Sequence, residues 1–160
     1  MAQDIFVKIT GIDGESQDAA HKNEIEASGW SWEVSQQSTM HSGSGGGAGK
    51  ATVEDLAFVH MVDRASPNLM KYCLTGKHID QAVLTVRKAG GSPLEYFKIT
   101  MTDVIVTKVQ PTGSKTDNGM LENIRLSFAK IKQEYIVQNA QGGSGGAVTA
   151  SYDIKSNKEA

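Results

Sequence analysis

The amino-acid sequence predicts a mainly β fold, a sandwich or a closed barrel with one short helix on its side. Apolar and polar residues alternate with a period of two along most of the chain, which is typical of half-buried strands. Turn-forming residues separate these alternating segments at short intervals. A single segment in the middle of the chain spaces its apolar residues as a helix does.

The alternation predicts roughly eight to ten strands, a number that favours a sandwich or barrel. Thr102 and Asp103 interrupt one alternating stretch and are expected to form a bend or a bulge. The predicted strands are residues 5–9, 30–35, 56–62, 83–87, 96–101, 104–109, 121–128, 133–137 and 148–154.

The predicted helix covers residues 66–76. Ser66 is a residue type that caps helices, Pro67 suits a first helical turn, and Gly76 suits the position just after a helix. Four apolar residues share one face of this helix: Leu69, Met70, Cys73 and Leu74.

Length and composition bound the function. The 160 residues fit a single domain spanning 1–160, and 16 basic against 18 acidic residues leave a net charge of −2. Phosphate neutralisation needs a basic surface, so nucleic acid is not an expected partner. The N-terminus shows no export signal, no apolar run is long enough for a membrane span, and the single Cys73 favours folding in a reducing cytoplasm.

A glycine-rich segment is expected to form a long extended loop over residues 39–54. Aligning Gly49 and Lys50 with a phosphate-binding loop puts Ser44 at its first glycine and Ala51 at its magnesium-binding hydroxyl, so both required positions fail. Long loops in compact domains often make contacts. We therefore interpret this segment as a loop that reaches a neighbouring molecule.

The residue types that catalysis or metal binding needs are scattered. Cys73 and His78 lie close in sequence, but no second cysteine or nearby carboxylate completes a zinc site. Cys73 also lies on the apolar helix face, where a buried structural thiol is expected. The sequence predicts no cofactor, no metal and no enzymatic activity.

Several segments together resemble the haemolysin-coregulated protein (Hcp) family of bacterial type VI secretion systems. The resemblance extends over essentially the whole chain, in order. The segments that carry it are residues 4–9, 14–18, 29–32, 45–50, 65–70, 75–78, 84–91, 94–96, 128–130 and 152–157. Glu33 replaces an expected small residue, and residues 112–120 and 138–147 look individual to this chain.

This resemblance implies a barrel of two antiparallel sheets with one flanking helix. It also implies hexameric rings that stack into the inner tube of the secretion system, assemble in the bacterial cytoplasm and are then exported without a signal peptide. The implied partners are further copies of the chain, effectors carried in the lumen, and the spike, sheath and baseplate proteins.

Two sets of residues are candidates for these contacts. Ser31, Glu33 and Ser35 alternate with the tryptophans and are expected to face the lumen and its cargo. The candidates for contacts between subunits or rings are Gly43, Gly45, Gly46, Gly47, Gly49 and Lys50.

The alternative function is a carbohydrate-binding β-sandwich module. Trp30 and Trp32 are two residues apart, so both indole rings fall on one strand face and could stack on a sugar. The same spacing suits two tryptophans that fill the core.

Overall fold

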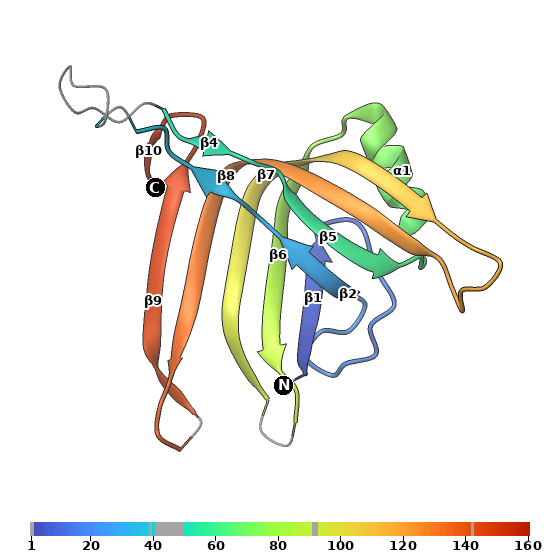
Figure 1. The fold of residues 1–160 in the computed structure, drawn as a ribbon, viewed down its shortest axis with the longest axis horizontal. Coiled ribbons are helices and arrows are strands. Elements are labelled where there is room, and N and C mark those ends of the chain that lie inside the picture. The colour runs from blue at the N-terminus through green and yellow to red at the C-terminus, as the bar shows by residue number, and fades with distance from the viewer. Residues whose placement is uncertain (1, 39, 41–49, 91–92, 142) are drawn as a thin grey trace.

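A closed antiparallel barrel forms the centre of the molecule (Figure 1). The computed structural model describes residues 2–38, 40, 50–90, 93–141 and 143–160. Within these residues lie one helix and ten strands: β1 (Gln3–Ile9), β2 (Ile25–Ser31), β3 (Val34–Ser35), β4 (Thr52–Val53), β5 (Leu56–Met61), α1 (Ser66–Thr75), β6 (Ile79–Lys88), β7 (Leu94–Thr112), β8 (Leu121–Gln138), β9 (Ser144–Asp153) and β10 (Lys158–Glu159).

Eight strands form one sheet in the order β10-β9-β8-β5-β2-β1-β6-β7, and pairing of β7 with β8 closes six of them into the barrel. β3 and β4 form a separate two-stranded antiparallel ribbon. The predicted mainly β barrel with one short flanking helix is confirmed.

The long strand β8 has two different neighbours on one side. Its first half, from Leu121 to Leu126, pairs with β5, whereas its second half, from Lys130 to Gln138, pairs with β9. β7 pairs with β8 along both halves. Part of the β7–β8 hairpin therefore belongs to the barrel, and the rest extends beyond the barrel with β9 paired along its outer edge (Figure 1).

The core lies inside the barrel and consists of alternate residues from its strands. Burial of each such side chain stabilises the fold by roughly 1.5–3 kcal/mol. The largest fully buried apolar side chains are Phe58, Ile25, Leu56, Leu69, Leu84, Ile99, Met101, Ile124, Leu126, Val7 and Val104.

The helix α1 begins and ends close to the predicted positions. Gly76 has φ 65° and donates its backbone N–H to Tyr72 O, as expected for the residue after a helix. Ser66, however, does not cap the helix. The N-cap is Ala65, and the Ser66 hydroxyl instead donates to Glu122 Oε1 of β8 at 2.9 Å.

Three predicted strand boundaries were wrong. Residues 96–101 and 104–109 belong to the single strand β7. Asp103 takes φ 56°, but the register with β6 and β8 does not shift there, so the strand continues. Residues 121–128 and 133–137 are likewise both part of β8. The predicted strand 30–35 is interrupted, since β2 ends at Ser31 and the chain re-forms a strand only at Val34.

The helix α1 is too short and too polar to cross a membrane, and no other helix lies among the described residues.

Candidate functional site

The three predicted lumen residues are all exposed, and the structure brings two of them together. Ser31 ends β2, Glu33 lies between β2 and β3, and Ser35 lies in β3. Ser31 and Glu33 line an open depression of about 390 Å³, and Ser35 is not part of its lining. The other residues of its wall are Trp32, Glu54, Asp55, Ala57 and Arg125.

Hydrogen bonds hold the shape of this depression. The Trp32 indole N–H donates to the Glu54 carbonyl oxygen at 2.8 Å. The Glu54 N–H donates back to the Glu33 carbonyl oxygen at 3.0 Å. Because these contacts use backbone groups, the Glu33 and Glu54 side chains stay available beside Ser31.

The depression carries charges of both signs. The Asp55 carboxylate accepts a hydrogen bond from the Thr107 hydroxyl at 2.6 Å. Arg125 is exposed, and its guanidinium makes no ion pair with any residue in the described part of the chain. Such a surface can bind polar and charged groups of another protein.

The two tryptophans pack mainly against the protein itself. Trp30 stacks on Phe97 with ring centroids 5.6 Å apart, and Trp32 lies tilted against Phe128 at 6.2 Å. Both indoles are half-buried beside the hydrophobic core. This packing favours the core role over the sugar-stacking role.

Five of the predicted subunit contacts, Gly43, Gly45, Gly46, Gly47 and Gly49, lie outside the described residues. Lys50 is exposed and precedes β4. The ribbon of β3 and β4 therefore flanks the glycine-rich segment on both sides.

The sheet has a free edge at β9. β10 pairs only with Tyr152 and Asp153, so among the described residues no strand lies on the outer side of residues 144–151, the side away from β8. The Ser151 carbonyl oxygen accepts the Ala160 N–H on this outer side. Since alternate residues of a strand point their backbone groups the same way, Thr149 and Ala147 also direct N–H and C=O outwards.

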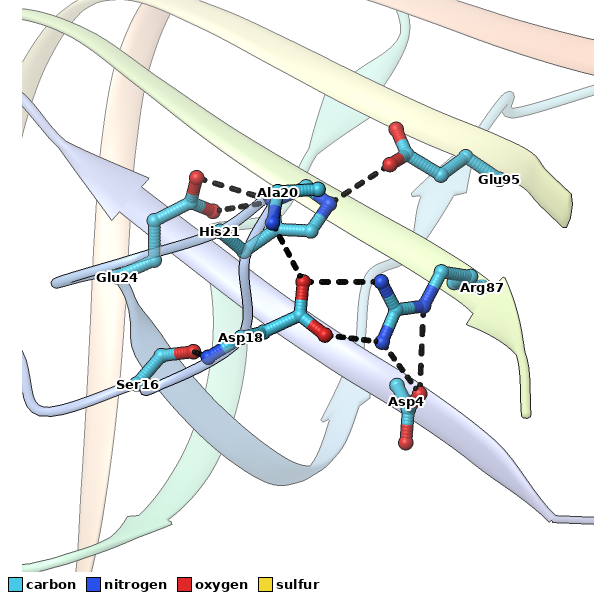
Figure 2. Close-up of polar contacts among 8 residues, drawn as sticks. All are labelled: Asp4, Ser16, Asp18, Ala20, His21, Glu24, Arg87 and Glu95. Atoms are coloured by element: carbon cyan, nitrogen blue, oxygen red, sulfur yellow. Dashed lines mark hydrogen bonds and ion pairs between the residues drawn. The ribbon is translucent and has the colours of Figure 1, made fainter. Parts of the chain in front are cut away.

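A network of charged residues fastens the segment between β1 and β2 onto the barrel (Figure 2). Arg87 of β6 donates to Asp4 of β1 at 2.8 Å and to Asp18 at 2.7 Å. The Arg87 guanidinium also lies 5.0 Å from the centre of the Phe6 ring. Its hydrogen bonds hold the pKa of Asp18 at about 2, below the usual 3.8.

His21 is the second fastening point of this segment (Figure 2). Its Nδ1 lies 3.0 Å from Glu24 and its Nε2 lies 2.8 Å from Glu95. The imidazole stacks on Phe6, with 4.3 Å between ring centroids. These three contacts fix the imidazole between the segment before β2 and the barrel.

The charged network was missed by the sequence analysis. Asp4, Asp18, Arg87 and Glu95 come from separate elements, and no spacing along the chain links them. The only local signal is the pair His21 and Glu24, three residues apart.

A buried polar cluster joins the start of α1 to the barrel. His60 of β5 is completely buried, and its Nε2 lies 2.8 Å from Glu122 Oε1. Its Nδ1 lies 3.7 Å from Asp63, too far for a hydrogen bond but close enough for electrostatic attraction. Burial alone would lower the pKa of His60, but the two carboxylates outweigh this effect and raise it.

Cys73 and His78, which lie close in sequence, have different surroundings in the structure. The imidazole of His78 lies with Nδ1 2.7 Å from the Asp103 carboxylate and lowers the pKa of that acid. Cys73 packs beside the core. Across residues 2–38, 40, 50–90, 93–141 and 143–160, no group of three or more His, Cys, Asp or Glu side chains is placed to hold a metal ion.

Comparison with known proteins shows consistent similarities. The family model described as "Type VI secretion system effector, Hcp" matches residues 6–135. Protein hcp1 of Pseudomonas aeruginosa is 45% identical over 162 aligned residues that cover 100% of both chains.

Solved structures agree with this similarity. The crystal structure of Hcp1 from Salmonella typhimurium has a TM-score of 0.83 and 55% identity, with 100% of each chain covered. A type VI secretion system effector from Yersinia pestis has a TM-score of 0.78 and 45% identity, covering 94% of this chain and 99% of that chain.

Proposed function

Because this chain belongs to the Hcp family of type VI secretion proteins, we propose that it is a structural subunit rather than a catalyst. It assembles with copies of itself into hexameric rings, and the rings stack into the tube of the secretion system. Assembly takes place in the bacterial cytoplasm, and the type VI machinery then exports the tube. Spike, sheath and baseplate proteins are its partners in that machinery.

The observation that carries the self-assembly proposal is the free edge of β9. An exposed strand edge presents unpaired N–H and C=O groups, and natural proteins normally cover or blunt it. β9 carries no proline and no charged side chain from Ser144 to Ser151, so nothing in its sequence blocks the approach of another strand. Pairing with a neighbouring subunit satisfies these groups.

A proline at Thr149 tests whether this edge is used. Thr149 directs its N–H outwards, away from β8, so Thr149→Pro removes a donor from the free edge and leaves the ladder with β8 intact. We expect rings to be lost, with light scattering after size exclusion showing the mass of one subunit instead of six.

The matched control is Thr149→Val, which keeps the N–H and the β-branched shape. Rings should persist in this variant. Normal rings from Thr149→Pro would contradict a role for the β9 edge. A wild-type protein that remains monomeric at high concentration would contradict the self-assembly proposal as a whole.

The depression beside Ser31 is the candidate cargo surface. Ser31 and Glu33 line it with the exposed Arg125, and charges of both signs on this surface can complement charged groups of an effector. In this proposal Ser31, Glu33 and Ser35 face the lumen of the ring.

Filling the depression should reduce cargo loading. Ser31→Trp places a large ring where effector side chains would lie, and we expect at least a tenfold loss of co-purified effector while the ring mass is unchanged. Ser114→Trp, in the exposed turn between β7 and β8, is the control. Unchanged loading in Ser31→Trp would remove the support for this lumen surface.

The segment 39–54, with Gly43, Gly45, Gly46, Gly47, Gly49 and Lys50, is proposed to contact a neighbouring subunit or ring. Glycine allows close approach of one backbone to another, because it has no side chain. The support for this role is the family resemblance of residues 45–50.

A further inference from the structure

Two exposed apolar surfaces lie away from the depression beside Ser31, and the first is on α1. Met70 and Leu74 are 52% and 78% exposed. Together with Pro67 and Lys71, which are also exposed, they form a stripe with the spacing of one helix face, here called the helix stripe. The opposite side of the same helix buries Leu69 in the core. The prediction that Leu69, Met70, Cys73 and Leu74 share one core-facing side was therefore wrong for Met70 and Leu74.

The second surface continues the core-facing side of the sheet beyond the barrel. Register places Tyr135 opposite Val148, Gln133 opposite Ala150 and Ile131 opposite Tyr152. These six residues form what is here called the β8–β9 face. Val148 is 63% exposed and Tyr135 is 46% exposed.

The β8–β9 face is hollowed at the end nearest the hydrophobic core. A depression of about 310 Å³ lies there, lined in part by Trp32, Ile131, Ala150 and Tyr152. Ala150 is small and leaves room above the sheet. Such a hollow can receive protruding aliphatic side chains, and the rim residue Glu159 would meet the only charge of the helix stripe, Lys71, with the opposite sign.

The elements that carry the two surfaces lie on opposite sides of the barrel: in Figure 1, α1 lies to the right of strands β1 and β6, and β9 lies to their left. A contact between them therefore cannot form within one subunit and uses a different patch on each partner. Contacts of this head-to-tail kind generate closed rings when the rotation between subunits closes. A two-fold contact, in contrast, would bring one patch against itself.

We propose that the helix stripe of one subunit docks on the β8–β9 face of the next subunit in the ring. This inference rests on the proposed self-assembly and names the surfaces that carry it. The helix stripe supplies Met70 and Leu74, and the β8–β9 face receives them between Trp32, Tyr135 and Val148. Pairing at the adjacent β9 edge would reinforce the same contact.

Two charged substitutions test the contact from each side. Leu74→Glu and Val148→Glu alter side chains that are mostly exposed, so the subunit itself should keep its fold and its thermal unfolding temperature. Each is expected to raise the concentration needed for ring formation by about 30-fold or more, as for loss of a central interface residue. Met120→Glu, at a residue that is 52% exposed and outside both surfaces, should leave rings unchanged.

Mixing the two variants tests the head-to-tail geometry. A Leu74→Glu subunit keeps an unaltered β8–β9 face, and a Val148→Glu subunit keeps an unaltered helix stripe. An equimolar mixture should therefore form a dimer with one intact contact, seen by light scattering at twice the subunit mass, and should not form rings.

The outcomes separate this inference from the proposed function. Rings from Leu74→Glu or Val148→Glu at wild-type concentrations, or a mixture without the dimer, would overturn the docking proposal while leaving self-assembly intact. Loss of effector or sheath binding with normal rings would assign the surfaces to those partners and overturn it equally. A wild-type protein without rings would defeat both.

Discussion

Replacing Glu122 with leucine is expected to lower the free energy of unfolding by about 3–5 kcal/mol at pH 6. Glu122 accepts hydrogen bonds from His60 at 2.8 Å and from the Ser66 hydroxyl at 2.9 Å. Without it, the completely buried His60 keeps only the distant carboxylate of Asp63. The cost arises because a buried charge loses its partner, and urea unfolding measures it.

The pH dependence of stability gives a second measurement of the same pair. The pKa of His60 is raised above its ordinary 6.5 in the folded protein. Its stabilising contribution is therefore fully present below pH 6.5 and is lost as the pH rises through the folded-state pKa. In Glu122→Leu this decline of stability above pH 6.5 should shrink.

A double variant provides the control. His60→Leu combined with Glu122→Leu removes both partners, and apolar replacements of buried ion pairs are often neutral or stabilising. The double variant should recover at least half of the stability lost by Glu122→Leu. If Glu122→Leu is as stable as the wild type, the cluster does not anchor α1 to the barrel.

Introducing a side chain at Gly14 should lower the free energy of unfolding by about 1–3 kcal/mol. A Cβ atom there would lie 2.6 Å from the Glu24 carbonyl oxygen and 2.8 Å from Ile25 Cα. Both are backbone atoms, and Ile25 is fully buried at the start of β2. Either β2 or the segment before it must therefore move.

The movement should also loosen the network around His21. Gly14 donates its N–H to the Asn23 carbonyl oxygen at 2.8 Å, next to Glu24. Movement of the backbone at Asn23 and Glu24 would carry the Glu24 carboxylate away from His21. We expect faster hydrogen exchange for residues 13–24 in Gly14→Ala, with little change in the barrel strands β7 and β8.

Gly29→Ala is the matched substitution. A Cβ atom at Gly29 meets nothing within 4 Å, and no positive φ is involved. Its stability should stay within about 0.5 kcal/mol of the wild type. Equal losses of unfolding free energy in the two variants would show that the general effect of replacing a glycine, and not the contact with Glu24, causes the change.

The sequence by itself determined the fold class. The period-two alternation predicted a mainly β sandwich or closed barrel, because half-buried strands place alternate residues in the core, and the family resemblance implied the barrel that the structure has. Pro67 and Gly76 marked the ends of the helix through local backbone preferences. Whole-chain resemblance also indicated the Hcp family, which the comparisons confirmed.

Tertiary structure alone decided which distant groups meet. Arg87 reaches both Asp4 and Asp18, and His60 reaches Glu122, across pairings that no local pattern encodes. Strand length was decided in the same way, since neighbours on both sides keep β7 continuous past Asp103.

The exposed β9 edge and the helix stripe likewise follow from topology. A sequence shows that Val148 and Leu74 are apolar, but only the arrangement of strands and helix leaves both side chains exposed, one on β9 and the other on α1. Local preferences act over a few residues, whereas burial and pairing depend on which segments the closed barrel brings together.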